Sequence, residues 1–338
     1  MAFKRFDSED FVVSSDSITS TLWSTGNPAL TEFYTSSIQE AGSSGNYYLS
    51  VYQTSSTLSD AQVQFDIVYA DALGSGSTWF NPIVPGNSYT KTMYGQYRSM
   101  ILEDENSNFI FGTGNNTLTS DHFWVLSIER ARYKQSLFPG SLNLQLSGSA
   151  GIINLTDNSR DVLVNTFIGS SRVFQLISGS NGTAGTLPNS GYVAGSGSYG
   201  LVFPDLGTIL LNPYAISQSI SVSPTRSNNA DTGLNNITLF NSINLGDSFA
   251  LNSQETITSD YVFIRARNSE FNYSENPSFI SGSTGEVIYD DFVNNPQVYI
   301  TTVGMYNDTN DLLAVAKLSR PLIKDFTKEA LIRVKLDF

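Results

Sequence analysis

The stretch that decides the fold class reads VYITTVGMY (298–306), NDTND (307–311), LLAVAKL (312–318) and, after Arg320-Pro321, ALIRVKLDF (330–338). The first and third runs are strand-like and the polar residues between them predict a turn, so 298–318 is expected to form a β-hairpin. The last run alternates, with Leu331, Arg333, Lys335 and Asp337 opposite Ile332, Val334, Leu336 and Phe338. We predict a terminal strand here, either paired within a sheet or offered as an edge to a partner.

Strand patterns continue toward the N-terminus. Alternation is clearest in 61–69, where Val63, Phe65, Ile67 and Tyr69 share one face. One helix is predicted, with Asn27 as N-cap, Pro28 in the first position and an end near Gly42. Further strands are predicted at 47–52, 97–102, 109–111, 122–128, 142–146, 171–177, 208–211 and 261–267.

Composition supports the same fold class. Only 14% of the 338 residues are charged, against roughly 25% in an ordinary soluble domain. Ser, Thr, Asn and Gly replace them, and these residues favour strands and turns over helices. We predict an all-β, multidomain, β-sandwich-like architecture with long Gly/Ser/Asn-rich loops and little helix. The expected divisions are an N-terminal domain (1–147), a Gly/Ser-rich middle domain that could be an insertion (148–250) and a C-terminal region (251–338).

The charge distribution bears on partners. The net charge is −13, and nucleic-acid-binding proteins normally carry a basic patch, so no nucleic-acid partner is expected. From Lys317 to the end there are six basic and three acidic residues, so this segment carries +3 and the remainder −16. A basic C-terminal segment could dock on an acidic neighbour or on another copy. No run approaches the ~20 apolar residues of a membrane span, so no membrane partner is expected either.

Residues that could carry chemistry are few. The chain has no cysteine and one histidine, His122, which we interpret as a cap or packing residue of a strand. The loop Asn307–Asp311 offers oxygens that calcium would accept, but it lacks the EF-hand glycine and distal glutamate, and a tight turn is favoured. The Gly-rich segments match no phosphate-binding motif. We therefore predict no catalytic residue, no metal site and no cofactor.

Two basic groups are candidate interface residues instead, because arginine is enriched at interface hot spots. The first follows a predicted strand, in IERARYK (128–134), where an ion-paired turn is the structural alternative. The second lies in the C-terminal segment. The candidates are Arg130, Arg132, Lys134, Arg320, Lys324, Lys328, Arg333, Lys335 and the terminal Phe338.

Several stretches suggest a family. PQVYITTVGMYNDTNDLLAVAKLSRP (296–321) and TKEALIRVKLDF (327–338) resemble the end of virion structural proteins from contractile-tailed bacteriophages, notably cyanophages. YGQYR (94–98), SIERARYK (127–134) and FNYSENP (271–277) add to the resemblance, whereas the middle of the chain contributes nothing. The ending is also similar to that of the baseplate wedge subunit of such tails.

The resemblance implies a multi-copy component of a phage tail or baseplate, made in the host cytoplasm and incorporated into the virion through contacts with other virion proteins. It implies no cofactor and no catalytic residues. Two alternatives stay open from the residues. A receptor-binding or fibre-attachment protein would recognise host glycans through aromatic and Asn residues on loops, and a polysaccharide hydrolase would need two carboxylates ~5 to 10 Å apart.

Overall fold

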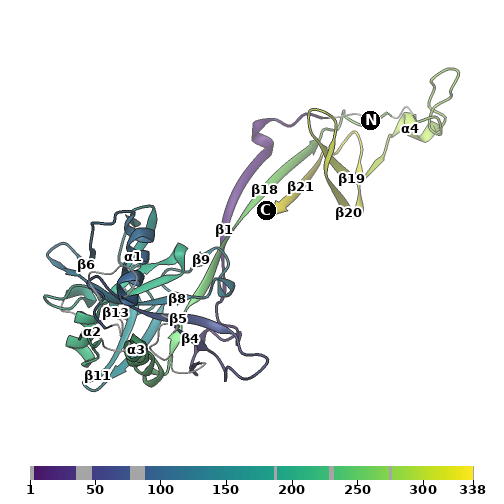
Figure 1. Cartoon of the computed structure of the whole chain (residues 1–338). Helices are drawn as coiled ribbons and strands as arrows, with labels where there is room; N and C mark the ends of the chain where they lie inside the picture. Colours follow the sequence, from purple (N-terminus) through teal and green to yellow (C-terminus); the bar gives the residue numbers. More distant parts are fainter. Residues whose placement is uncertain are drawn as a thin grey trace. The chain divides into compact units, whose positions relative to one another are not determined.

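The computed structural model describes residues 4–35, 48–76, 88–185, 189–227, 232–273 and 276–337 (Figure 1). The chain forms two compact units. Unit 1 comprises Met1–Ser17 and Thr256–Phe338, and unit 2 comprises Ile18–Glu255. The chain passes from one unit to the other within strand β1 (Phe11–Thr21) and returns within strand β18 (Asn252–Ala266).

Unit 2 is dominated by one curled antiparallel sheet of 13 strands. The main path runs β2-β17-β10-β11-β13-β15-β16-β8-β5-β4-β3, and β12 and β14 pair with β13 off this path. Strands make up 46% of the structure and helices 17%, which confirms the predicted all-β class. The strands are β2 (Ala29–Leu30), β3 (Tyr34–Thr35), β4 (Tyr48–Tyr52), β5 (Val63–Asp71), β8 (His122–Ile128), β10 (Asn143–Gly148), β11 (Gly151–Asp157), β12 (Thr166–Ile168), β13 (Ser171–Ser180), β14 (Thr183–Ala184), β15 (Gly200–Phe203), β16 (Thr208–Leu211) and β17 (Phe249–Ala250).

Both faces of the sheet centre are buried, because each central strand divides its apolar residues between two cores. In β8, Trp124 and Leu126 belong to one core, whereas Phe123 and Val125 belong to the other. The predicted face of β5 is confirmed for Phe65, Ile67 and Tyr69, which lie together in the first core. A strand that is buried on both faces has a nearly continuous apolar sequence, and residues 122–128 show this pattern.

Helices cover the two faces. The first core includes residues of α2 (Pro213–Ile220) and α3 (Thr232–Gly246), and the second includes residues of α1 (Tyr89–Leu102). Asn212 caps α2, since its side chain accepts a hydrogen bond from the Tyr214 amide, and Pro213 occupies the first turn. The remaining short elements of unit 2 are β6 (Phe109–Thr113), β7 (Asn116–Ser120), β9 (Ser136–Leu137) and the 3₁₀ turns Arg130–Arg132, Asn189–Gly191 and Pro204–Leu206.

Two local predictions are wrong. The strand predicted at 97–102 is the second half of α1, whose buried residues Tyr94, Tyr97 and Ile101 follow helical spacing. The helix predicted from Asn27 does not form, because Ala29–Leu30 and Tyr34–Thr35 are strands; its remainder, 36–42, lies outside the described residues. Sheet pairing outweighs the local signal in 29–35, and packing of the helix against the sheet outweighs it in α1.

The division of the chain also differs from the predicted one. The boundary expected between 147 and 148 falls in the β10–β11 hairpin, where Gly148 pairs with Gly151 inside the large sheet. The Gly-rich middle segment therefore supplies strands to the same sheet as the N-terminal segment. The insertion is larger than predicted, because all of 18–255 separates the two parts of unit 1.

Unit 1 contains a hairpin and three strands of a four-stranded sheet, whose short fourth strand β9 pairs with the start of β18 in unit 2. The sheet has the order β1-β18-β21, where β21 is Ala330–Asp337, and β18 pairs with β21 in register from Ser259↔Asp337 to Ala266↔Ala330. The hairpin joins β19 (Val298–Tyr306) to β20 (Leu312–Lys324), as predicted. Two short helical elements, Ser8–Asp10 and α4 (Asp290–Asn294), complete the unit.

The hairpin turn uses its own oxygens. The Asn307 side-chain carbonyl accepts hydrogen bonds from the amides of Thr309 at 3.1 Å and Asp311 at 2.7 Å. The Asp311 carboxylate accepts from the Asn307 amide group at 3.0 Å and from the Thr309 hydroxyl at 2.6 Å. These bonds hold the pKa of Asp311 below its usual value. The polar residues at 307–311 therefore close a turn, which was the favoured interpretation.

Candidate assembly surface

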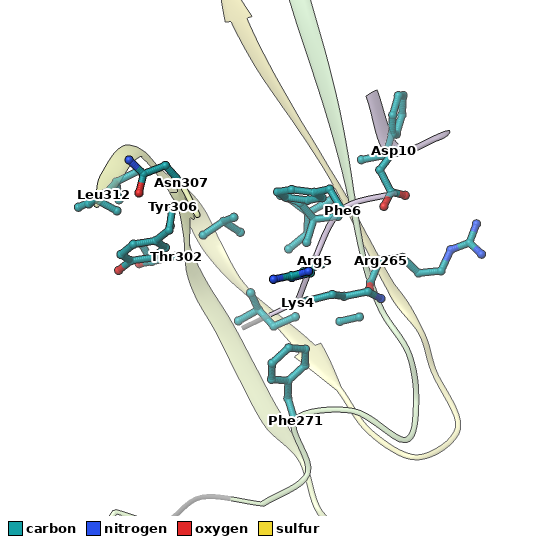
Figure 2. Close-up of a pocket in the computed structure, with 18 of the residues that line it drawn as sticks. Lys4, Arg5, Phe6, Asp10, Arg265, Phe271, Thr302, Tyr306, Asn307 and Leu312 are labelled. Atoms are coloured by element: carbon teal, nitrogen blue, oxygen red, sulfur yellow. The ribbon is translucent and has the colours of Figure 1, made fainter. Parts of the chain in front are cut away.

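An open cleft lies in unit 1 between the β19–β20 hairpin and the N-terminal segment on β18. Its volume is about 1020 Å³, at the upper limit of ordinary ligand pockets. Figure 2 shows Phe6 and Phe271 on either side of Arg5, with Tyr306 and Leu312 on the hairpin wall. The walls are mainly apolar, and Lys4, Arg5, Arg265, Asp10 and Asp308 supply charges of both signs. The β19–β20 hairpin and the sheet that contains β18 therefore do not pack against each other along this cleft.

The N-terminal segment is tied to the end of β18. The Lys4 ammonium donates to the Arg265 carbonyl and lies 3.3 Å from the Glu270 carboxylate. Glu270 also accepts a hydrogen bond from the Arg267 amide at 2.9 Å, and this bond contributes most to the lowering of its pKa. These contacts hold Phe6 inside the unit, where it packs against the small core.

That core is small for the amount of apolar surface that unit 1 carries. Its buried members are Val262, Met305 and Val334, with partly buried residues around them. Among the described residues of unit 1, large apolar side chains that are exposed outnumber those that are buried, which is the reverse of unit 2. The exposed ones are Phe11, Val12, Val13, Phe271, Tyr273, Ile288, Tyr289, Val293, Tyr299, Tyr306, Leu312, Leu313, Val315, Leu322, Ile323, Phe326 and Leu331.

Scattered exposed apolar residues are normal in a monomer, but clusters of them mark interaction sites. Leu312 and Leu313 begin β20, and Leu322 and Ile323 are near its end. Successive side chains of a strand point to opposite faces, so both faces of β20 expose apolar residues at its two ends. Strand β1 is exposed at every residue except Ser14, which is half-buried. We call the exposed apolar residues of unit 1, together with its cleft, the assembly surface.

The predicted basic interface residues of the C-terminal segment lie in unit 1. Arg320, Lys328, Arg333 and Lys335 are exposed, as an interface residue of a free chain should be. Arg320 precedes Pro321 in an irregular part of β20, between the pairs Thr302↔Lys317 and Ile300↔Leu322. The irregularity has a physical reason, since proline lacks the amide hydrogen that a regular ladder needs. Phe338 lies outside the described residues.

The prediction of Lys324 as an interface residue is wrong. Its side chain is fully buried, and its ammonium donates to the Asn268 carbonyl at 3.1 Å and to the Asn272 side chain at 2.7 Å. Lys324 therefore anchors the loop after β18 to the end of the hairpin. A buried cation with oxygen partners is a structural group, and it is not available to a partner protein.

The other predicted group, Arg130, Arg132 and Lys134, lies in unit 2 at a 3₁₀ turn after β8. Arg130 donates to the Tyr133 carbonyl at 2.7 Å and lies over the Tyr133 ring, and Arg132 donates to Gln62 at 2.6 Å. The turn is held by these contacts, and no ion pair of its arginines occurs in the described part of the chain. The two predicted basic groups thus belong to different units.

A partly buried charge network in unit 2 has no counterpart in the predictions. Arg226 binds two carboxylates, with Nε 2.7 Å from Asp71 and Nη2 2.8 Å from Asp121. Asp71 is fully buried at the end of β5 and also accepts hydrogen bonds from the amides of Leu73 and Ser75. Burial opposes the charge of Arg226, but the hydrogen bonds to the two carboxylates outweigh it and raise its pKa.

His122 belongs to the same network. Its Nδ1 lies 2.8 Å from the Asp121 carboxylate, and its ring packs edge-on against Tyr69 and Tyr214. The packing role predicted for His122 is confirmed. Burial lowers the pKa of His122, with the Arg226 charge adding to the effect, although the Asp121 hydrogen bond opposes it. The pKa of Asp121 is lowered as well, since bonds from His122 and Arg226 outweigh its partial burial.

These shifts predict an acid-sensitive stability of unit 2. Because the pKa of His122 is lower in the folded state, the unfolded state binds its proton more readily, and the free energy of unfolding should fall as the pH drops below about 6.5. His122→Gln should flatten this slope. Urea unfolding at a series of pH values, followed by tryptophan fluorescence, measures it. His122 is the only histidine, so an unchanged slope in the variant would contradict the prediction.

Comparison with known proteins adds no assignment: no family model, no curated protein and no solved structure matches the chain. Within the described ranges, no helix has the length and apolarity needed to cross a membrane. The same residues contain no group of three or more His, Asp or Glu side chains placed to hold a metal ion.

Proposed function

We propose that this protein is a structural component of a bacteriophage virion, assembled into the tail or baseplate through interfaces formed by unit 1. Its partners are other virion proteins, with several copies of the chain in each particle. The observation that carries the proposal is the imbalance in unit 1, whose apolar side chains are mostly exposed around a core of Val262, Met305 and Val334. The resemblance of the C-terminal sequence to virion proteins supports the same conclusion.

The physical argument rests on burial. A small unit that leaves most of its large apolar side chains in water gains little hydrophobic stabilisation, at about 25 cal/mol per Å² of buried apolar surface. Obligate interfaces resemble a domain core cut in half, so the missing burial can come from neighbouring proteins. Unit 2 needs no such help, since its two cores bury Phe65, Trp124, Phe203 and other large residues completely. Unit 2 thus acts as the folded body, and unit 1 acts as the part that joins the assembly.

The proposal predicts that particle incorporation depends on exposed leucines of unit 1. The full chain carrying Leu313→Lys and Leu331→Lys, whose side chains are 68% and 59% exposed, should be incorporated at least about tenfold less than wild type. The reason is that each lysine would place a charge in an apolar contact worth more than about 1 kcal/mol. Quantitative mass spectrometry of particles purified after infection, with the variant supplied in place of the wild-type chain, measures incorporation.

The matched control carries Leu163→Lys and Leu245→Lys, which change the same residue type at exposed positions of unit 2, 101% and 67% exposed. It should be incorporated normally. Circular dichroism of each purified variant checks that the fold is retained. Equal incorporation of both variants, or absence of the wild-type chain from particles, would overturn the proposal.

A further inference from the structure

Strand β1 is an edge strand of the unit 1 sheet in the part of the chain that the structure describes. In the order β1-β18-β21 it is an outer strand, and no strand of the described chain other than β18 pairs with it. Soluble proteins protect such edges with lysines, prolines, bulges or short strands, because an open row of amide and carbonyl groups recruits another strand. Over its 11 residues, FVVSSDSITST, β1 contains no lysine, arginine or proline, and its one charge is Asp16. Phe11, Val12 and Val13 are 47%, 48% and 66% exposed.

Strand β21 forms the opposite edge of the same sheet and carries the opposite charge. It pairs with β18 along its whole length, and no further strand pairs with it in the described residues. Its exposed face bears Leu331, Arg333 and Lys335. Arg333 lies over the Tyr261 ring at 5.4 Å and Lys335 at 6.0 Å, so both cations are held on the sheet by β18.

The two edges carry charges of opposite sign. Lys335 forms an ion pair with Asp337 at 2.9 Å, and Asp16 is the one charged residue of β1, the strand on the other side of β18. Neighbouring strands are about 4.8 Å apart, so a second sheet placed with its β1 edge against this β21 edge can bring its Asp16 within ion-pair reach of Lys335. Pairing of two β1 edges would join strands whose one charge is Asp16, and pairing of two β21 edges would bring the cations of both copies together, so neither arrangement gains this attraction.

We propose that the β1 edge of this protein binds the β21 edge of a second copy, so that the unit 1 sheet continues from one copy into the next. The contact is heterologous, since two different edges meet, and each copy keeps one edge free for another copy. Repetition therefore closes a ring or extends an array, which is how a multi-copy virion component could be arranged. This pairing would give the assembly surface of unit 1 one specific partner, a second copy of the chain. Only its place in a virion rests on the proposed function.

Charge reversal on the full chain tests the pairing. Asp16→Lys and Lys335→Asp should each raise the dissociation constant for self-association about tenfold, because each variant replaces an attraction across the contact by a repulsion. An equimolar mixture of the two variants should recover association, since each contact between the two different variants again joins a cation to an anion. Sedimentation velocity over a concentration series measures all three samples.

The matched control reverses two exposed charges on the hairpin, Asp308→Lys and Lys317→Asp, and should associate as wild type does. Thermal unfolding of each variant shows whether unit 1 stays folded. A wild-type chain that remains monomeric up to its solubility limit would overturn the inference. Association that the single variants leave unchanged would overturn it too, because the copies would then meet at another surface, such as two β1 edges.

The two proposals fail separately. If the chain does not self-associate but the leucine variants of unit 1 are still lost from particles, a different virion protein occupies the surface and only the sheet-extension inference is wrong. If the chain self-associates through the charged edges but never enters particles, the pairing stands and the virion function is wrong.

Discussion

Phe65→Ala should lower the free energy of unfolding of unit 2 by about 3–5 kcal/mol, the range for truncating a fully buried phenylalanine. Phe65 is 0% exposed in β5, and its ring contacts those of Trp23, Phe33 and Phe249. These residues come from distant parts of the chain and are fixed by different elements. The elements around Phe65 therefore cannot shift one by one to fill the cavity that its truncation leaves. Urea unfolding followed by tryptophan fluorescence measures the loss, since all three tryptophans fall between residues 18 and 255.

The control for this variant is Phe167→Ala in the same unit. Phe167 lies in the short strand β12 and is 62% exposed, so its truncation should change the free energy of unfolding by no more than about 0.5 kcal/mol. Similar losses for the two variants would mean that Phe65 is not at the centre of a tightly packed core.

Asp71→Ala should also be damaging, at about 2–4 kcal/mol, because buried polar groups lose their partner. The change leaves the amides of Leu73 and of the buried Ser75 without an acceptor and removes one of the two carboxylates that bind Arg226. Arg226 keeps Asp121 and its side chain is 28% exposed, so the loss falls below that of a fully buried ion pair. The same urea unfolding experiment, carried out near neutral pH, measures the effect.

Asp60→Ala provides the comparison, since the Asp60 side chain is exposed. It changes the net charge of the chain by the same amount as Asp71→Ala does. Asp71→Asn should fall between the two, because an amide can still accept hydrogen bonds from the two backbone groups. If Asp71→Ala were as mild as Asp60→Ala, Arg226 would be satisfied by Asp121 alone, and the network would contribute little to stability.

Local sequence pattern is enough to predict some of the strands and turns. The strand predicted at 122–128 is β8 with the same bounds, and the 298–318 hairpin forms as expected. In these segments a run of strand-forming residues is bounded by polar turn residues, so local preference and tertiary packing agree. In α1 they conflict, since its Tyr, Thr and Gly residues favour other structures while its buried side recurs at helical spacing.

The sites are harder to predict than the strands. Arg226 lies 155 residues from Asp71 and 105 from Asp121 in the sequence, so no spacing rule could join them. Lys324 shows the reverse error: its basic side chain suggested a surface position, whereas two asparagines 56 and 52 residues away bury it with oxygen partners. Both outcomes depend on long-range contacts that a charge pattern does not encode.

The division of unit 1 by the insertion of 18–255 has a consequence for how the protein is made on the ribosome. Strand β1 is synthesised first, yet its partner β18 begins at Asn252, more than two hundred residues later. At about 5–20 residues per second, β1 waits on the order of tens of seconds with Phe11, Val12 and Val13 unpaired. Unit 2 can fold in the meantime, because all its residues emerge before β18 is complete. Nascent chains on one messenger RNA therefore expose unpaired β1 segments close together. A chaperone or a neighbouring copy has time to bind these segments before the sheet of unit 1 forms.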